Sequence, residues 1–206
     1  MAPSFFQSDP VTLARDLLGQ TLVRVIDGRR LSGVIVETEA YLGEPDRAAH
    51  TFGGRRTQRN ASMWLEGGHA YVYFTYGMHH CMNIVAGRAG QPVAVLLRAL
   101  EPIEGIDAMY ARRNKAKRDT DLCSGPAKLC QALAIDRTLD GRDLRCDGEL
   151  FVERARRRAM PDRRIVTTSR IGVHYAGQWA HKPLRFYVRG NPHVSVRVRE
   201  ASPSPP

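Results

Sequence analysis

An alternating segment at residues 33–41, GVIVETEAY, constrains the fold more than any other part of this sequence. Positions 34, 36, 38 and 40 alternate with Glu37, Glu39 and Tyr41, and this period of two predicts a β-strand. Core strands usually bury uncharged side chains, whereas this strand places two carboxylates and a phenol on one face. Such a face is either a solvated edge or part of a desolvated pocket in which a carboxylate activates water.

The rest of the chain is rich in short strands that do not alternate with helices as βαβ units. We therefore expect an α+β fold, a single domain over residues 1–206 with a largely antiparallel sheet. Strands are predicted at 21–26, 31–41, 70–75, 78–85, 93–99, 165–170, 184–188 and 194–198, with tight turns at Asp27-Gly28 and Tyr76-Gly77. Helices are predicted from Asp9-Pro10 to Gly19 and at 101–113 and 126–133; residues 151–158 are expected to be a surface connection, and 1–8 and 201–206 flexible.

The balance of charge suggests the partner. Lys and Arg number 31 against 21 Asp and Glu, a formal charge of +10 that fits a nucleic-acid-binding protein, although a merely soluble basic protein has the same composition. Residues 1–10 lack the features of a secretory signal and no apolar run could span a bilayer, so we expect a cytoplasmic, nucleoid-associated protein.

Metal and disulfide chemistry are not expected. The four cysteines contain no CxxC pair, and we predict reduced, mostly buried thiols, with Cys146 the most exposed. His79 and His80 are adjacent in a predicted strand and would point to opposite faces, so they do not form one metal site.

Three features could contact DNA. The aromatic run at 71–76 ends at Gly77, and a hairpin tip there could insert Tyr76 into a base stack, although cross-strand aromatic packing would explain the run equally well. The loop GGRRTQRN (53–60) carries phosphate-binding residue types, and SGPAK (124–128) could begin a helix that binds an anion. The run RARRR (154–158) is less specific, and we interpret it as a solvated face.

Longer motifs provide a family resemblance. The segments VETEAYLG (36–43), AAH (48–50), YVYFTYGM (71–78), CMNI (81–84), LLRALEP (96–102), LCSGPAKLCQAL (122–133) and KPLRFYVRG (182–190) closely resemble the alkyladenine (3-methyladenine, mammalian-type) DNA glycosylases, in order and from about residue 9 to residue 198. The chain resembles a compact bacterial-type member.

This resemblance implies a monofunctional glycosylase that flips damaged purines and cleaves their N-glycosidic bond. The substrates implied are 3-methyladenine, 7-methylguanine, hypoxanthine and ethenoadenine in double-stranded DNA, with no metal or organic cofactor and a monomeric protein. The implied fold is a curved antiparallel sheet with helices around it and a protruding hairpin that intercalates into DNA.

The resemblance also implies roles for individual residues. Glu39 would activate water, with Arg98 ordering the catalytic site. The base pocket would comprise Tyr41, His50, Tyr73, Asn83 and Leu96, with Asn83 rejecting guanine. DNA would be contacted by Tyr76 at the hairpin tip and by Arg55, Thr57, Arg59, Met78, Lys128 and Gly172.

Two departures and two alternatives remain. His79-His80 and the residues at 87–92 differ from the familiar vertebrate pattern, which bears on the substrate range. The same basic and aromatic residues would also suit a non-catalytic nucleic-acid-binding module, but a pure binder gains nothing from a carboxylate that repels phosphate. A hydrolase of a small cationic molecule is disfavoured by the basic charge.

Overall fold

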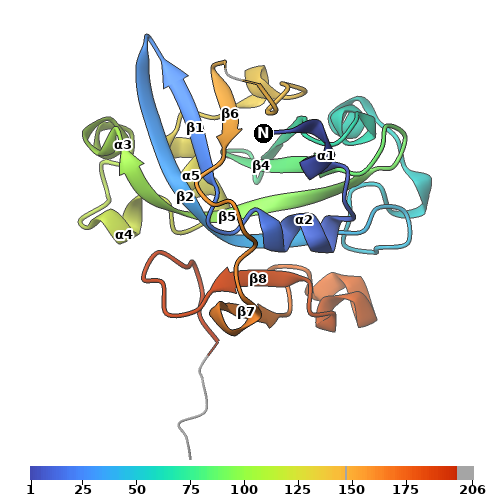
Figure 1. Ribbon diagram of the computed structural model, residues 1–206. Coiled ribbons are helices and arrows are strands. Elements are labelled where there is room, and N and C mark those ends of the chain that lie inside the picture. Colours follow the sequence, from blue (N-terminus) through green and yellow to red (C-terminus); the bar gives the residue numbers. More distant parts are fainter. Residues whose placement is uncertain (147, 199–206) are drawn as a thin grey trace, which may run out of the picture.

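This protein is built on a sheet of antiparallel strands. The computed structural model describes residues 1–146 and 148–198. Over these residues, eight strands form one sheet in the order β3-β4-β5-β2-β1-β6, with β8 pairing to both β2 and β7 (Figure 1). The strands are β1 (Thr21–Ile26), β2 (Arg29–Tyr41), β3 (Ala70–Thr75), β4 (His79–Ala86), β5 (Val93–Glu104), β6 (Leu150–Glu153), β7 (Ile165–Thr168) and β8 (Arg185–Val188).

Helices begin where the sequence supplies caps and prolines. The Asp9 carboxylate accepts hydrogen bonds from the backbone N–H groups of Val11 and Thr12, both at 3.0 Å, and Pro10 occupies the first turn. The α-helices are α1 (Pro3–Phe6), α2 (Pro10–Asp16), α3 (Ile106–Arg112), α4 (Asp119–Leu122) and α5 (Pro126–Ala132). Short 3₁₀ segments are η1 (Phe52–Gly54), η2 (Gln58–Trp64), η3 (Arg137–Leu139), η4 (Asp162–Arg164) and η5 (His174–His181).

Strand β2 lies at the centre of the sheet and its two faces have different neighbours. The Thr38 hydroxyl donates to the Ala14 carbonyl oxygen at 2.8 Å, so this face of β2 packs against α2. Residues on either side of Thr38 point to the opposite face, because side chains alternate along a strand. Glu37 and Glu39 therefore lie across the sheet from α2.

Most of the predicted elements are present, and the differences have physical causes. The strand predicted at 93–99 continues to Glu104, where a helix was expected, because a shift in register with β2 accommodates Pro102 and its missing N–H. Residues 1–8 were expected to be loose, but they contain α1, whose Phe6 side chain is fully buried.

Two further predictions were wrong. Residues 151–153 were assigned to a surface connection, yet Phe151 and Val152 are buried in β6, which pairs with β1. No strand forms at 194–198; instead Ser195 donates its N–H to the Glu37 carboxylate, so a side chain replaces the sheet partner. The tail predicted at 201–206 lies outside the described residues.

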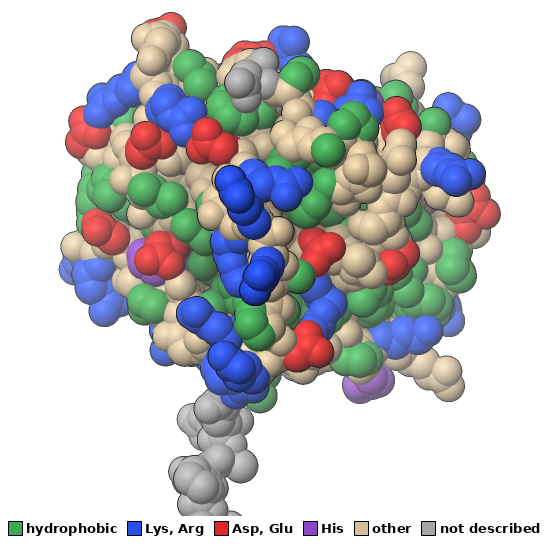
Figure 2. Space-filling model, in the orientation of Figure 1, with side chains coloured by type: hydrophobic (Ala, Val, Ile, Leu, Met, Phe, Trp, Pro, Cys, Tyr) green, Lys and Arg blue, Asp and Glu red, His purple; other side chains and the backbone are tan. Residues whose placement is uncertain are grey.

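Basic side chains gather on the face that carries α2. Figure 2 shows Lys and Arg side chains in a column over the segment that descends from β6 to β7. Across the part of the chain that the structure describes, no helix has both the length and the apolar character needed to cross a bilayer.

Candidate active site

A cavity of about 280 Å³ lies between the sheet and the loops that follow β2 and β7. Five tyrosines and one histidine are among the residues that line it, together with a few polar groups, which suits a flat ring system. Among the residues predicted from the sequence, the lining includes Tyr41, His50, Tyr73, Tyr76, Asn83, Leu96, Arg98 and Gly172.

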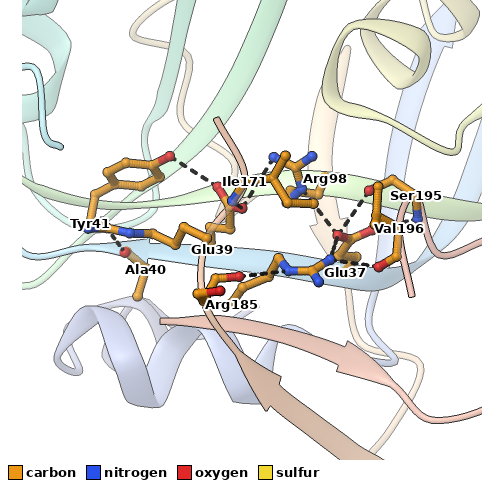
Figure 3. Close-up of polar contacts among 11 residues, drawn as sticks. Glu37, Glu39, Ala40, Tyr41, Arg98, Ile171, Arg185, Ser195 and Val196 are labelled. Carbon is orange, nitrogen blue, oxygen red and sulfur yellow. Dashed lines mark hydrogen bonds and ion pairs between the residues drawn. The ribbon is translucent and has the colours of Figure 1, made fainter. Parts of the chain in front are cut away.

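Glu39 lies directly behind the residues that line the cavity and is not part of the lining itself, and its side chain is fully buried. Its Oε1 accepts the N–H of Ile171 at 2.8 Å and lies 3.2 Å from Nη1 of Arg98. Its Oε2 accepts the hydroxyl of Tyr41 at 3.0 Å (Figure 3). Burial raises the pKa of Glu39, and the positive charge of Arg98 and these hydrogen bonds offset part of the rise.

Glu37, two positions earlier, is also fully buried and has four donors. Its Oε1 accepts from Nε of Arg98 at 3.1 Å, Nη1 of Arg185 at 2.7 Å and the hydroxyl of Ser195 at 3.0 Å, and its Oε2 accepts the Ser195 N–H at 2.7 Å. Figure 3 shows Arg98 between the two carboxylates. The face of β2 that carries both is therefore part of a compensated ion network and not a solvated edge.

Aromatic rings form the opposite wall of the cavity. Nδ1 of His50 lies 2.7 Å from the Tyr71 hydroxyl, and the His50 ring meets the Tyr73 ring edge-on at 4.6 Å between centroids. Desolvation of the ring, followed by the nearby charges of Arg59 and Arg55, lowers the pKa of His50 to about 4. His50 is thus a neutral ring at pH 7 and adds no positive charge of its own to those of Arg55 and Arg59.

The Tyr41 ring is supported from behind by a buried ion pair. Arg170 makes a two-pronged contact with Asp46, at 2.6 and 2.9 Å, and both side chains are fully buried. The Arg170 guanidinium carbon also lies 4.6 Å from the Tyr41 ring centroid, within the range of a cation–π interaction. This pair holds the Tyr41 ring on the face of the sheet that carries Glu39.

The β3–β4 hairpin rises beside the cavity. Tyr76 at its turn is 85% exposed and has a left-handed backbone with φ of 51°, and Met78 is 70% exposed. An exposed aromatic and an exposed thioether on a tight turn leave both side chains free for a partner.

Basic residues lie close to the same mouth. Arg55, Thr57 and Arg59 line a second cavity of about 290 Å³ that shares His50 with the first. Nη2 of Arg59 donates to the Phe74 carbonyl oxygen at 2.9 Å, which ties this loop to the hairpin. Lys128, half-buried in the first turn of α5, lies 3.3 Å from the Ser124 hydroxyl and is not part of either lining.

Some residues of the site were not predicted from the sequence. These are the Asp46–Arg170 pair, the Ile171 backbone N–H, and Cys81, Met63, Val173 and Tyr175 in the lining. The charged sequence around Asp46 and Arg170 gives no periodic signal, and their separation of 124 positions hides the pairing. Within residues 1–146 and 148–198, no group of three or more His, Cys, Asp or Glu is placed to hold a metal, and Cys146 is exposed as predicted.

Comparison with known proteins identifies the class to which this fold and site belong. The model of the methylpurine-DNA glycosylase (MPG) family matches residues 4–192, and the chain belongs to this family. It is 49% identical to the "DNA-3-methyladenine glycosylase" of Mus musculus, over 100% of this chain and 64% of the mouse protein. The corresponding human protein is 50% identical over 96% of this chain and 68% of its own length.

A shorter relative has nearly the same extent as this chain. A protein of Methanocella arvoryzae, provisionally named a 3-methyladenine DNA glycosylase, is 48% identical over 94% of each chain. The chain thus spans about two thirds of the length of the mouse relative and nearly all of the archaeal one.

Proposed function

We propose that this protein is a monofunctional DNA glycosylase that removes alkylated or deaminated purines from double-stranded DNA. The observation that carries the proposal is the fully buried Glu39, its pKa raised, directly behind an aromatic cavity with an exposed Tyr76 at its mouth. Family membership supports the proposal. The proposed substrates are 3-methyladenine, 7-methylguanine, hypoxanthine and ethenoadenine in chromosomal DNA, acted on by a monomer.

The proposed cycle begins with base flipping. Tyr76 enters the base stack and occupies the space of the extruded nucleotide. The flipped purine lies between Tyr41 on one side and His50 and Tyr73 on the other. If the purine is cationic, electron-rich rings add about 1–2 kcal/mol of attraction in a water-poor site. Asn83, held by a 3.2 Å hydrogen bond from its Nδ2 to the Tyr71 carbonyl oxygen, crowds the exocyclic amine of normal guanine.

Glu39 then acts as the general base. Its carboxylate accepts a proton from a water molecule as the water oxygen attacks C1′ of the deoxyribose and the N-glycosidic bond breaks. The electrons of that bond leave with the purine, and the sugar becomes an abasic site. A raised pKa makes Glu39 the stronger base, while Arg98 keeps it ionised and fixes one of its oxygens.

The DNA backbone is held around the cavity mouth. In this proposal the DNA backbone is contacted by the residues for which the family resemblance implies this role, which are Arg55, Thr57, Arg59, Met78, Lys128 and Gly172. Basic groups give affinity without sequence preference, which suits an enzyme that searches for rare lesions.

A glycosylase assay tests the proposal. Wild-type protein and a Glu39→Gln variant are incubated with duplexes that each carry one of the four proposed lesions, and abasic sites are cleaved with alkali. We expect the wild type to produce breaks and Glu39→Gln to lose about 10²–10⁴-fold in single-turnover rate. Glu44→Gln, a change at an exposed carboxylate nearby, is the matched control and should keep the full rate.

The outcomes separate the function from the mechanism. No breaks with wild-type protein on any of the four lesions would exclude the function. Equal rates for Glu39→Gln and the wild type would leave the function standing and remove Glu39 as the base.

A further inference from the structure

An arginine-rich stretch on the face away from the cavity has no part in the proposed catalysis. We define the arginine segment as residues 154–164, which contain Arg154, Arg156, Arg157, Arg158, Arg163 and Arg164. All are exposed except Arg156, which is half-buried. The surface column of basic side chains in Figure 2 follows this segment.

The charges of the arginine segment are not neutralised by the protein. The neighbouring carboxylates already have partners, because Glu153 pairs with Arg30 at 3.0 Å and Asp162 pairs with Arg15. Within residues 1–146 and 148–198, none of the arginines in the segment forms an ion pair. Five exposed guanidinium groups therefore face solvent along one stretch of backbone, whereas the guanidinium of half-buried Arg156 donates to the Ala159 carbonyl oxygen at 3.4 Å. A row of exposed positive charges attracts a polyanion.

Backbone and side-chain contacts fix the segment on the α2 side of the sheet. The Gln20 side chain accepts the Ala155 N–H at 3.1 Å, and its Nε2 donates to the Arg156 carbonyl oxygen at 3.4 Å. A Cβ atom on Gly19 would lie 2.6 Å from Cδ of Arg156, so the segment packs closely on the turn that ends α2. Helix α2 covers the Thr38 face of β2, whereas Glu39 points to the opposite face.

The arginine segment and the cavity mouth are therefore on opposite sides of the sheet. Figure 1 shows the segment passing in front of the sheet between β6 and β7, on the side where α2 lies. DNA is stiff over about 150 base pairs, so one short duplex seated at the cavity does not wrap round to the other face.

We propose that the arginine segment binds the phosphate backbone of a second DNA duplex while the cavity face holds the first. This inference rests on the proposed glycosylase function for the first duplex. The protein would then bridge two DNA segments and pass from one to the other without release into solution.

The composition of the segment favours DNA over other polyanions. Its apolar residues are two alanines, one proline and Met160, and Met160 is buried, so it offers no apolar side chain for insertion into a membrane. The segment has neither helix nor strand between residues 154 and 161, so its charges follow an irregular stretch of backbone with bends at Arg157 and Arg158. A duplex carries one phosphate about every 1.7 Å of axis and can match such a row without a specific fit.

A bridging assay tests the proposal. Undamaged 30-base-pair duplexes are fixed to beads, and a fluorescent undamaged duplex is added with the protein at a series of salt concentrations. We compare the wild type with R157Q/R158Q/R164Q and with a matched control, R88Q/K115Q/K117Q, which removes the same charge from exposed loops elsewhere. Single-turnover excision from a lesion duplex is measured at saturating concentrations of all three proteins.

We expect the wild type and the control to capture the fluorescent duplex, and R157Q/R158Q/R164Q to lose about tenfold or more in capture. For R157Q/R158Q/R164Q, the slope of log capture affinity against log salt concentration should be less negative by about 3 than for the wild type. Excision by R157Q/R158Q/R164Q should stay within twofold of the wild type. Light scattering at the assay concentration should give the mass of one chain, so that capture does not result from dimerisation.

Several outcomes would overturn the inference. The first is that R157Q/R158Q/R164Q captures the fluorescent duplex as well as the wild type does. The others are that the wild type captures no duplex, or that capture depends on a dimer. A further arm of the test uses fluorescent polyglutamate as the probe. If the triple substitution abolishes polyglutamate binding but leaves DNA bridging intact, the surface is assigned to an acidic protein instead. Excision without bridging removes only this inference, whereas bridging without excision of any lesion removes the proposed function.

Discussion

Nη1 of Arg98 lies 3.2 Å from Oε1 of Glu39, and the same guanidinium donates through Nε to Glu37. One positive charge is therefore shared by two fully buried carboxylates. Desolvation is the main reason why the pKa of Glu39 is raised, and Glu37 adds to the rise while Arg98 opposes it. The position of Arg98 between the two carboxylates therefore limits how far the pKa of Glu39 rises.

The first prediction concerns pH. In the proposed mechanism Glu39 acts in its ionised form, so kcat/KM should fall as pH falls through its pKa, with a midpoint above the ordinary glutamate value of 4.5. The other charged and titratable groups near Glu39 are Glu37, Tyr41, Tyr73, Cys81, Arg98 and Arg170. The measurement is the pH profile of ethenoadenine excision, and an acidic limb centred at or below 4.5 would contradict the prediction.

Glu37 can be tested through the same profile. Glu37→Gln removes a neighbouring negative charge and leaves Arg98 to Glu39 alone, so the acidic limb should move to lower pH. Circular dichroism at each pH confirms that the variant is folded. A purely structural role for Glu37 predicts a lower yield of folded protein with the limb unmoved, and that result would sink the idea.

The second prediction concerns the pair behind Tyr41. Asp46→Asn leaves the buried Arg170 charge without its carboxylate and should lower the free energy of unfolding by about 3–5 kcal/mol. Asp162→Asn breaks the Arg15–Asp162 pair, in which the Asp162 side chain is 91% exposed. This change should alter the free energy of unfolding by less than about 1 kcal/mol. Urea denaturation compares the two, and equal losses would show that burial does not set the strength of these pairs.

The third prediction concerns the hairpin tip. Tyr76→Ala should keep the free energy of unfolding within about 0.5 kcal/mol of the wild-type value because the Tyr76 ring is exposed. It should weaken extrusion of the lesion more than binding to undamaged DNA. The fluorescence of ethenoadenine, which is quenched in a base stack, reports extrusion, and anisotropy reports binding. Ile103→Ala, at the far end of β5, is the control. If Tyr76→Ala lost extrusion and binding to the same degree, the intercalating role of Tyr76 would be removed.

The fourth prediction concerns discrimination. Asn83 is 4% exposed and fixed by its bond to the Tyr71 carbonyl oxygen, so its side chain has little freedom to move aside. Asn83→Ser shortens the side chain and should raise excision of normal guanine relative to 7-methylguanine. The ratio of the two single-turnover rates is the measurement, and an unchanged ratio would exclude Asn83 as the discriminating residue.

The sheet was largely predictable from the sequence because its signals are local. Alternation identified β2, and Asp27-Gly28 and Tyr76-Gly77 identified the turns that join β1 to β2 and β3 to β4. Prediction failed where distant residues decide the structure. Pro102 argues against a strand until β2 is known to shift register beside it, and residues 194–198 look like a strand until Glu37 takes the Ser195 N–H.

The site was predictable in part for the same reason. Glu39 and Tyr41 were expected on one face, and the hydrogen bond between them is present. The partners of Glu37 are 61 positions away at Arg98, 148 at Arg185 and 158 at Ser195. No pattern in a single sequence shows that these groups meet, so the full burial of both carboxylates was visible only in the structure.

The distance in sequence between Glu37 and its donors has a consequence during synthesis. Glu37 is made by the ribosome 148 positions before Arg185 and 158 positions before Ser195. Until these two residues are made, the Glu37 carboxylate lacks three of its four donated bonds and retains its hydration shell. The proposed base is thus organised only after these donors have been translated, and nascent chains that stall earlier carry the hairpin and the basic loop without the assembled ion network.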